Sequence, residues 1–300
     1  MATVVRNFPL EKIVPVPITP LEIMDIGAML EGEERFYALT ARNMAHVTGF
    51  EPDEKEFAKL TATRDPQRFT YHPFFLGDGG EATFHLAEYP GCSSLYPPNP
   101  AVIDLFTGMS STEGGFSIVK KIPVQTHRLD DIENLAMPDI IKLDIQGHEL
   151  VVLEHGRKAL ASALMIEMET EFVPMYVGQP LFCDVQAFMI KHGFMLHKLI
   201  DVGGRCYKPM VANNHPYTPM SQVLWTDAVF IRDVTDMSRY SNDDLLKAAL
   251  LAHELYSSCD LAFFYLKTYD DRHGTELKKR YREMLAAHPV RPFMLNVRTG

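Results

Sequence analysis

The stretch from Asp139 to Gly156, DIIKLDIQGHELVVLEHG, limits the possible folds more than any other part of this chain. Its first half is a short apolar run, which is followed by Asp144, by a glycine that permits a sharp turn, and by Glu149. A carboxylate such as Glu149 suits the positive end of a helix dipole. The pattern therefore predicts a buried strand, an acidic turn and then a helix, which Gly156 would end from its C′ position.

The acidic turn has two interpretations at this point. Open α/β sheets bind ligands at the carboxyl ends of their parallel strands, where Asp144 and Glu149 are expected. A strand–helix junction whose acids only cap the helix would give the same sequence, so both interpretations stay open.

A second stretch, Leu21–Asp53, adds to the first. An apolar strand ends in the sequence DIGA at 25–28, a helix is expected from about Glu33, and a second strand covers His46–Phe50. Glu51 follows that strand, 24 positions after Gly27. This is close to the offset of about 20 residues at which an acid reaches a ribose in doubly wound folds.

Several further motifs complete this pattern, in the order GFEPD at 49–53, LGD at 76–78, Ser94-Leu95, HRLDDI at 127–132 and KLDIQGHE at 142–149. Together with DIGA, they resemble the FkbM family of S-adenosylmethionine-dependent methyltransferases over residues 21–171. The most specific piece is KLDIQGHELVVLEHG. Two departures stand out. Met29 and Leu30 delay the next glycine to Gly32, and His148 replaces a residue that is commonly small in the family.

The resemblance implies an α/β fold, a Rossmann-like doubly wound sheet of the class I methyltransferase type. Alternating segments at Ala82–Leu86 and Ile118–Gln125 predict an added antiparallel hairpin, and the tail has helical periodicity. We expect an N-terminal extension at 1–20, a methyltransferase domain at 21–235 with insertions near 79–126 and 202–221, and a C-terminal helical extension at 236–300. The C-terminal helices are candidates for a docked pair, a lid or a homo-oligomer surface.

The resemblance also implies a set of residues that bind S-adenosylmethionine: Asp25, Gly27, Ala28, Glu51, Gly77, Asp78 and Asp144. Glu51 would hold the two ribose hydroxyls, because a carboxylate can accept from both. Gly77 and Asp78 would contact the adenine, and Asp144 would lie beside the sulfonium and the acceptor. For Asp78, a plain turn residue in Gly-Asp-Gly-Gly is the alternative.

A hydroxyl acceptor benefits from a base near its proton. The catalytic candidates are Asp144, His148 and Glu149, with Glu167 as a further one. Histidine has the most suitable unperturbed pKa for this role. These carboxylates, with Glu167 or Glu169, could also hold a divalent cation, since carboxylate clusters suit magnesium or calcium. Metal-free chemistry is favoured, because the spacing fixes no third ligand.

Composition excludes some classes of function. The chain has 39 acidic and 29 basic residues and a net charge of −10, which disfavours nucleic acid as a substrate. No stretch approaches the roughly 20 apolar residues of a membrane span, so we expect no such span and a reducing, cytoplasmic setting. The chain has four cysteines, Cys92, Cys183, Cys206 and Cys259, and none of them form a Cys-x-x-Cys pair. Their spacing therefore argues against a zinc site and against a disulfide framework.

The leading prediction is a methyltransferase that modifies a hydroxyl of a small-molecule or carbohydrate acceptor, such as a sugar, a glycolipid or a secondary metabolite. A nicotinamide-dependent oxidoreductase is an alternative, although residues 27–32 lack the Gly-x-Gly-x-x-Gly of a pyrophosphate-binding turn. A catalytically silent scaffold is the other alternative. Acceptor specificity would depend on the long loops at 89–115 and 202–221 and on the tail.

Overall fold

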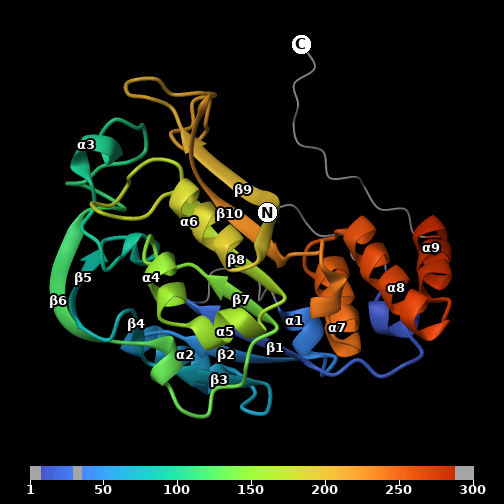
Figure 1. The fold of residues 1–300 in the computed structure, drawn as a ribbon. Helices are drawn as coiled ribbons and strands as arrows, with labels where there is room; N and C mark the ends of the chain where they lie inside the picture. Colours follow the sequence, from blue (N-terminus) through green and yellow to red (C-terminus); the bar gives the residue numbers. More distant parts are fainter. Residues whose placement is uncertain (1–7, 30–35, 288–300) are drawn as a thin grey trace. The chain divides into compact units, whose positions relative to one another are not determined.

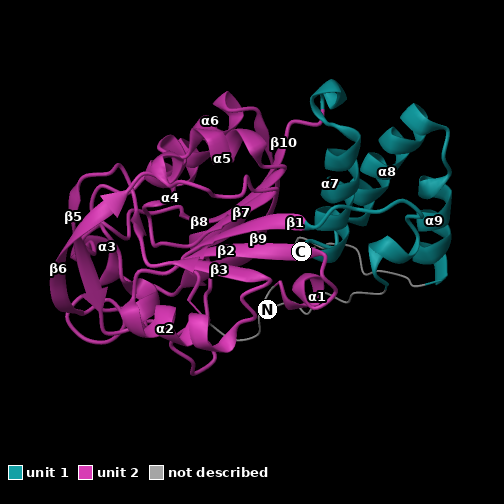
Figure 2. Cartoon of the chain, turned by 90° about the horizontal axis from the view of Figure 1, so that it is seen from below, with its two compact units in different colours: residues 1–20, 235–300 teal, residues 21–234 magenta. Residues whose placement is uncertain are grey.

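The structure, a computed structural model, describes residues 8–29 and 36–287. Two compact units divide the chain (Figure 2), one formed by residues 21–234 and the other by residues 1–20 together with 235–300. The two ends of the chain, which the sequence pattern treats as separate extensions, thus form a single unit.

The larger unit is built on a seven-stranded sheet with the order β3-β2-β1-β7-β8-β10-β9 (Figure 1). Its strands are β1 (Leu21–Ile26), β2 (Ala45–Phe50), β3 (Phe69–His72), β7 (Ile140–Leu143), β8 (Met165–Glu171), β9 (Phe194–Arg205) and β10 (Gln222–Arg232). The first five strands of this order pair in parallel, while β10 is antiparallel to both β8 and β9. The predicted Rossmann-like doubly wound sheet of the class I methyltransferase type is confirmed.

Helices of this unit follow the strands along the chain: α1 (Tyr37–Thr40), α2 (Glu54–Thr63), α3 (Pro100–Ile103), α4 (Glu149–Glu154), α5 (Arg157–Ser162) and α6 (Phe182–Lys191). Asp53 caps α2 by accepting from the backbone N–H groups of Lys55 and Glu56, each at 3.0 Å. The expected start of the first helix, near Glu33, lies outside the described residues, as do the altered positions Leu30 and Gly32.

The prediction that Gly156 closes the helix at its C′ position is confirmed, because α4 ends at Glu154 with His155 as the C-cap residue. The φ of Gly156 is −126°, which is not left-handed, and α5 begins at the next residue. Glycine is needed there for space instead, because a Cβ at this position would lie 2.7 Å from Cδ2 of Leu129 and 3.0 Å from the carbonyl oxygen of Val152.

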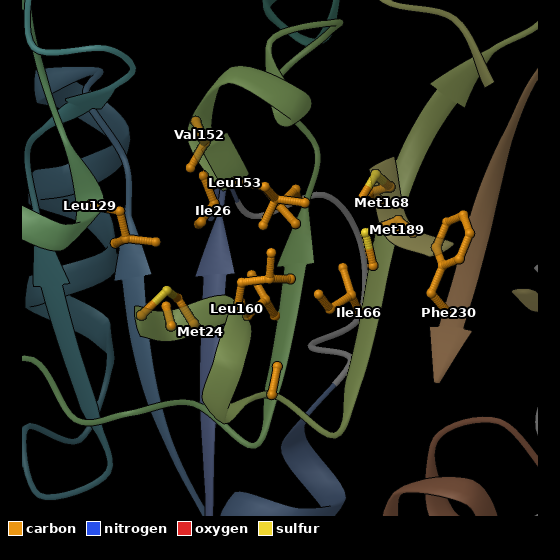
Figure 3. Packing of buried hydrophobic residues seen from close by; sticks show 14 of the residues in the cluster. Met24, Ile26, Leu129, Val152, Leu153, Leu160, Ile166, Met168, Met189 and Phe230 are labelled. Atoms are coloured by element: carbon orange, nitrogen blue, oxygen red, sulfur yellow. The ribbon is translucent and has the colours of Figure 1, made fainter. Parts of the chain in front are cut away.

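One face of the sheet packs against α4, α5 and α6 in a continuous apolar core (Figure 3). Met24 and Ile26 of β1 and Ile166 and Met168 of β8 are 1% exposed or less and lie in this core. Side chains alternate between the faces of a strand, so the residue between each pair, Asp25 or Glu167, projects to the other face. This alternation places charged side chains on the opposite face of the sheet without interrupting the core.

The predicted hairpin is present as β5 (Glu81–Ala87) paired antiparallel with β6 (Ile118–His127). β4 (Phe75–Leu76) joins it in parallel to give a three-stranded sheet. The loop expected over 202–221 is shorter than predicted, because β9 continues to Arg205.

The smaller unit contains α7 (Asn242–Glu254), α8 (Cys259–His273) and α9 (Leu277–Ala287). The imidazole of His253 bonds to the hydroxyl of Tyr281 at 2.9 Å and to the carbonyl of Phe8 at 2.7 Å, which holds the N-terminal segment to the helices. The apolar run at 261–266 lies within α8, where Tyr265 and Leu266 are fully buried. Within the described part of the chain, no helix is long and apolar enough to cross a membrane.

Candidate active site at the carboxyl edge of the sheet

Two turns meet at the carboxyl edge of the parallel strands. Gly27, which follows β1, has a φ of +83°, and a Cβ on it would lie 2.1 Å from the carbonyl oxygen of Asp144, which follows β7. The N–H of Asp144 donates to the carbonyl of Ile26 at 3.0 Å, and the N–H groups of Gly27 and Ala28 donate to Phe50 at 3.1 Å. Only glycine allows this approach, so the two motifs are joined through their backbones.

A lysine lies between the aspartates of these two turns. The Nζ of Lys142 is 3.7 Å from Oδ1 of Asp25 and 3.7 Å from Oδ2 of Asp144. Asp25, Lys142 and Glu167 are aligned in register across β1, β7 and β8, so their side chains share one face of the sheet. Sequence reasoning did not assign Lys142 a role, although it is the first residue of the KLDIQGHE motif.

Glu51 is buried just beyond β2, with 6% of its surface exposed. One carboxylate oxygen, Oε1, accepts from the N–H of Asp53 at 2.8 Å. Burial raises the pKa of Glu51 to about 7, and the charges of Asp53, Glu56 and Asp25 add to the rise. This carboxyl group therefore changes charge near neutral pH.

Gly77 and Asp78 form a turn against β6. A Cβ on Gly77 would lie 2.9 Å from the Cβ of Thr126, so this turn also requires glycine for space. The carboxylate of Asp78 accepts from the N–H of Gly80 at 2.8 Å and from the hydroxyl of Thr126 at 3.3 Å. The Gly80 bond lowers the pKa of Asp78, whose side chain thus supports its own turn.

The three catalytic candidates have different environments. The Asp144 side chain is 41% exposed, and its Oδ1 accepts from the side-chain amide of Gln146 at 3.2 Å. Glu149 is buried, and its Oε1 accepts from the N–H groups of Ile145 at 2.8 Å and Gly147 at 3.2 Å. Burial raises the pKa of Glu149 to about 7. Glu149 therefore shapes the turn, whereas Asp144 faces solvent.

His148 lies at the start of α4 with its ring centroid 5.1 Å from that of Tyr96. Burial lowers the pKa of His148 to about 4, so the imidazole is neutral at physiological pH. Its Nδ1 is buried and makes no hydrogen bond with the described residues. A neutral ring with a free nitrogen can accept a proton or a hydrogen bond.

Gln146 connects the acidic turn to β8 and to two loops. The sequence analysis gave Gln146 no role. Its side-chain amide donates to Asp144 and to Glu169, while its Oε1 accepts from the hydroxyl of Tyr176 at 2.9 Å. The hydroxyl of Ser94 donates to its backbone carbonyl at 2.7 Å. The Ser94-Leu95 pair was noted in the sequence only as part of the motif order, and Tyr176 gave no signal.

β8 carries three acidic side chains on the face of the sheet where Glu169 contacts Gln146. Glu167, Glu169 and Glu171 alternate along the strand, and Glu167 and Glu171 are each 2% exposed. Burial raises the pKa of Glu171 to about 8 and that of Glu169 well above its usual value, and neighbouring carboxylates add to both shifts. Among the described residues, no group of three or more histidine, cysteine, aspartate or glutamate side chains is arranged to hold a metal ion.

The strand order and the glycine turn at the end of β1 define a domain of the class I methyltransferase type. The family model for the methyltransferase FkbM domain matches residues 25–196, and the chain belongs to this family. A hexuronic acid methyltransferase, AglP of Haloferax volcanii, is 29% identical over 133 residues, which cover 44% of this chain. The chain spans 50% of that protein's length.

Solved structures with a related fold are more distant. A methyltransferase from Mesorhizobium loti has 10% identity and a TM-score of 0.39, with 74% of this chain and 95% of that chain covered. Magnesium protoporphyrin IX methyltransferase from Synechocystis PCC 6803 has 11% identity and a TM-score of 0.35, with 75% and 76% covered. The fold assignment therefore rests on the strand order, and the family assignment rests on the domain match.

Proposed function

We propose that this protein is an S-adenosylmethionine-dependent methyltransferase that methylates a hydroxyl group of a sugar-type acceptor. The observation that carries the proposal is the junction of Gly27 with Asp144, in a chain that belongs to the FkbM family. This junction brings the glycine turn of β1 and the acidic turn of β7 to the same edge of the sheet, where open α/β folds bind ligands.

The residues present fit the cofactor. Glu51 is a buried carboxylate beyond β2, suited to accept hydrogen bonds from a ribose diol. Asp25, Gly27 and Ala28 would line the methionine part, with the ammonium of Lys142 between Asp25 and Asp144. Gly77 and Asp78 would lie by the adenine. When bound, S-adenosylmethionine supplies an electrophilic methyl group, and this chain positions the acceptor in line with it.

For proton transfer we propose His148, because its neutral ring has a free Nδ1, whereas Glu149 is engaged by two backbone N–H groups. Asp144 would orient the acceptor hydroxyl from the solvent-facing side of the turn. These roles use the chain's own groups and call for no metal ion.

The sugar-type acceptor is supported by the relative from Haloferax volcanii, whose name specifies a hexuronic acid. The carboxylates at this edge of the sheet, among them the solvent-facing Asp144, also suit an acceptor rich in hydroxyl groups.

Calorimetry with S-adenosylmethionine, S-adenosylhomocysteine and NAD tests the class of enzyme. We expect both sulfur compounds to bind and NAD to give no heat. Transfer of labelled methyl groups to a panel of sugars and sugar acids then tests the activity. Binding of NAD alone would indicate an oxidoreductase, while cofactor binding without transfer to any acceptor would indicate a silent scaffold.

A further inference from the structure

Arg205, the last residue of β9, is held between two aromatic rings. The carbon at the centre of its guanidinium group lies 4.8 Å from the ring centroid of Trp225 and 5.1 Å from that of Tyr217. Both distances are within the range of cation–π attraction. Trp225 in turn lies over Gly203, where a Cβ would come within 2.1 Å of the indole. We call Arg205, Trp225 and Tyr217 the arginine clamp.

The hydrogen-bonding capacity of Arg205 is largely unused. Its Nη1 donates to the carbonyl of Gly204 at 2.7 Å, while its Nε is buried and makes no hydrogen bond with any described residue. A guanidinium group has five N–H donors, and burying one without a partner is unfavourable. Nε and Nη2 form the edge of the group that pairs with a carboxylate through two parallel bonds.

No carboxylate of the described residues forms an ion pair with this arginine. The chain carries 39 acidic residues, yet the 24 positions from Val202 to Trp225 contain none. A half-buried arginine without an acidic partner is therefore a local exception in a chain of net charge −10. Because charges removed from water are stabilised by pairing, an anion beside Arg205 would stabilise the clamp.

The arginine clamp lies beside the candidate active site. In the pairing of β10 with β8, Trp225 is opposite Glu171 and Asp227 is opposite Glu169, so the two pairs share one face of the sheet. Two residues along a strand correspond to about 7 Å. Because Glu169 is bonded to Gln146, which is bonded to Asp144, the clamp is one row of side chains beyond the acidic turn.

We propose that the arginine clamp binds the carboxylate of an acidic sugar acceptor and presents a hydroxyl of that sugar to the acidic turn. The inference rests on the proposed function and names the acceptor class for the same site. A single guanidinium matches one carboxylate, and flanking aromatic rings can cover the apolar faces of a sugar.

The surroundings favour a carboxylate over a phosphate group. Glu171 lies opposite Trp225, and Asp227 lies in the next row, where its carboxylate repels a dianion more strongly than a monoanion. Burial raises the pKa of Glu171 to about 8, so this neighbour is mostly uncharged at neutral pH and tolerates a carboxylate nearby. Burial also lowers the pKa of Arg205, and a bound anion would offset that desolvation.

Trp225 is the only tryptophan of the chain, so its fluorescence reports directly on the clamp. Titration of the full chain with sodium glucuronate, in the presence of S-adenosylhomocysteine, should give a saturable change in Trp225 fluorescence. The methyl ester of glucuronate has nearly the same shape without the charge, and we expect it to bind at least tenfold more weakly. Equal affinities for the two compounds would overturn the proposal without the need for any variant.

The variant R205Q should abolish the preference for glucuronate over its ester, while R205K, which keeps the charge but not the planar fork, should retain part of it. Thermal melting checks that each variant is folded. An unchanged preference in folded R205Q would contradict the proposal, as would an equal response of the wild-type protein to inorganic phosphate. Binding of S-adenosylhomocysteine, measured separately by calorimetry, shows whether a failure concerns the clamp alone or the proposed function as well.

Discussion

The two halves of the sheet edge are built differently. At the ends of β1 and β2, the contacts are mainly hydrogen bonds between backbone groups of short sequence motifs. Glu51 contributes one buried carboxyl group to this half. At the carboxyl ends of β7 and β8 and at the start of β10, side chains from distant parts of the chain meet, among them Gln146, Tyr176 and Trp225. Under the proposed function, the first half would supply the fixed geometry that a common cofactor needs, and the second would supply the varied side chains that distinguish acceptors.

The electrostatics of the two halves differ as well. Lys142 balances Asp25 and Asp144 at the junction between them. Beyond it, burial raises the pKa values of Glu169 and Glu171, so that part of this acidic side is protonated near neutral pH. The second half of the sheet edge therefore has less negative charge than its number of carboxyl groups suggests.

The largest effect should come from separating the two halves at their junction. In Gly27→Ala, the new Cβ meets the Asp144 carbonyl at a positive φ, so we expect destabilisation of about 3 kcal/mol or more and loss of cofactor binding. Gly178→Ala is the matched control, because Gly178 has a φ of +85° with no atom within 4 Å of the added Cβ. Urea unfolding of both variants measures the clash alone, and equal destabilisation would show that Gly27 is not a packing requirement.

Asp144→Asn tests the side chain at that junction while preserving its shape. Turnover should fall by about 10²-fold, with cofactor affinity changed by less than about threefold, because charge and positioning at the transition state are lost but ground-state contacts remain. Steady-state kinetics with the true acceptor and calorimetry measure the two quantities. Wild-type turnover would remove the acidic turn from the active site.

Adding EDTA to the unmutated protein separates a metal role of this turn from a direct role. We expect activity to be unaffected, because the described residues form no metal-binding group. Loss of activity that magnesium restores would instead assign Asp144 to a metal site.

The affinity for S-adenosylhomocysteine should depend on pH through Glu51. The ribose hydroxyls donate to the ionised carboxylate, and the pKa of Glu51 in the free protein is about 7. Affinity should therefore rise about tenfold between pH 6 and pH 8, as the carboxyl group loses its proton before binding. Glu51→Gln cannot ionise, so its affinity should be constant over this range. The same pH dependence in both proteins would exclude Glu51 as the source.

The smallest effect concerns Glu171, the last residue of β8. Burial raises the pKa of Glu171 to about 8, so the folded protein holds a proton that the unfolded chain releases above about pH 4.5. The stability from this group is complete below that pH and is lost as the pH rises through 8. The melting temperature should drop between pH 6.5 and pH 8.5, and Glu171→Gln should reduce the drop. An identical drop in the variant would contradict the assignment.

The sequence predicted the fold and the turns at the ends of β1 and β7 well, because the signals there are local. Apolar runs gave the strands, and the motifs DIGA and KLDIQGHE gave the turns that Gly27 and Asp144 join. Neither motif alone shows that their backbones touch, since that contact depends on β1 and β7 being neighbours in the sheet.

The acceptor half could not be predicted in this way. Ser94, Gln146 and Tyr176 are far apart in the sequence and meet only through the folded loops. Arg205 was placed in a predicted loop, yet it ends β9, and its contact with Trp225 requires the β9–β10 hairpin. Periodicity indicates which residues share a face of one element, but it carries no information about contacts between loops.

Calorimetric titration of S-adenosylhomocysteine into the wild-type protein and into Glu51→Ala tests whether the cofactor binds at the ends of β1 and β2. We expect the wild-type protein to bind and the folded variant to bind more weakly by about 2–4 kcal/mol, because two charge-assisted hydrogen bonds to the ribose are lost. Equal affinity in the two proteins, with melting curves that show both to be folded, would contradict the placement of the cofactor at the ends of β1 and β2.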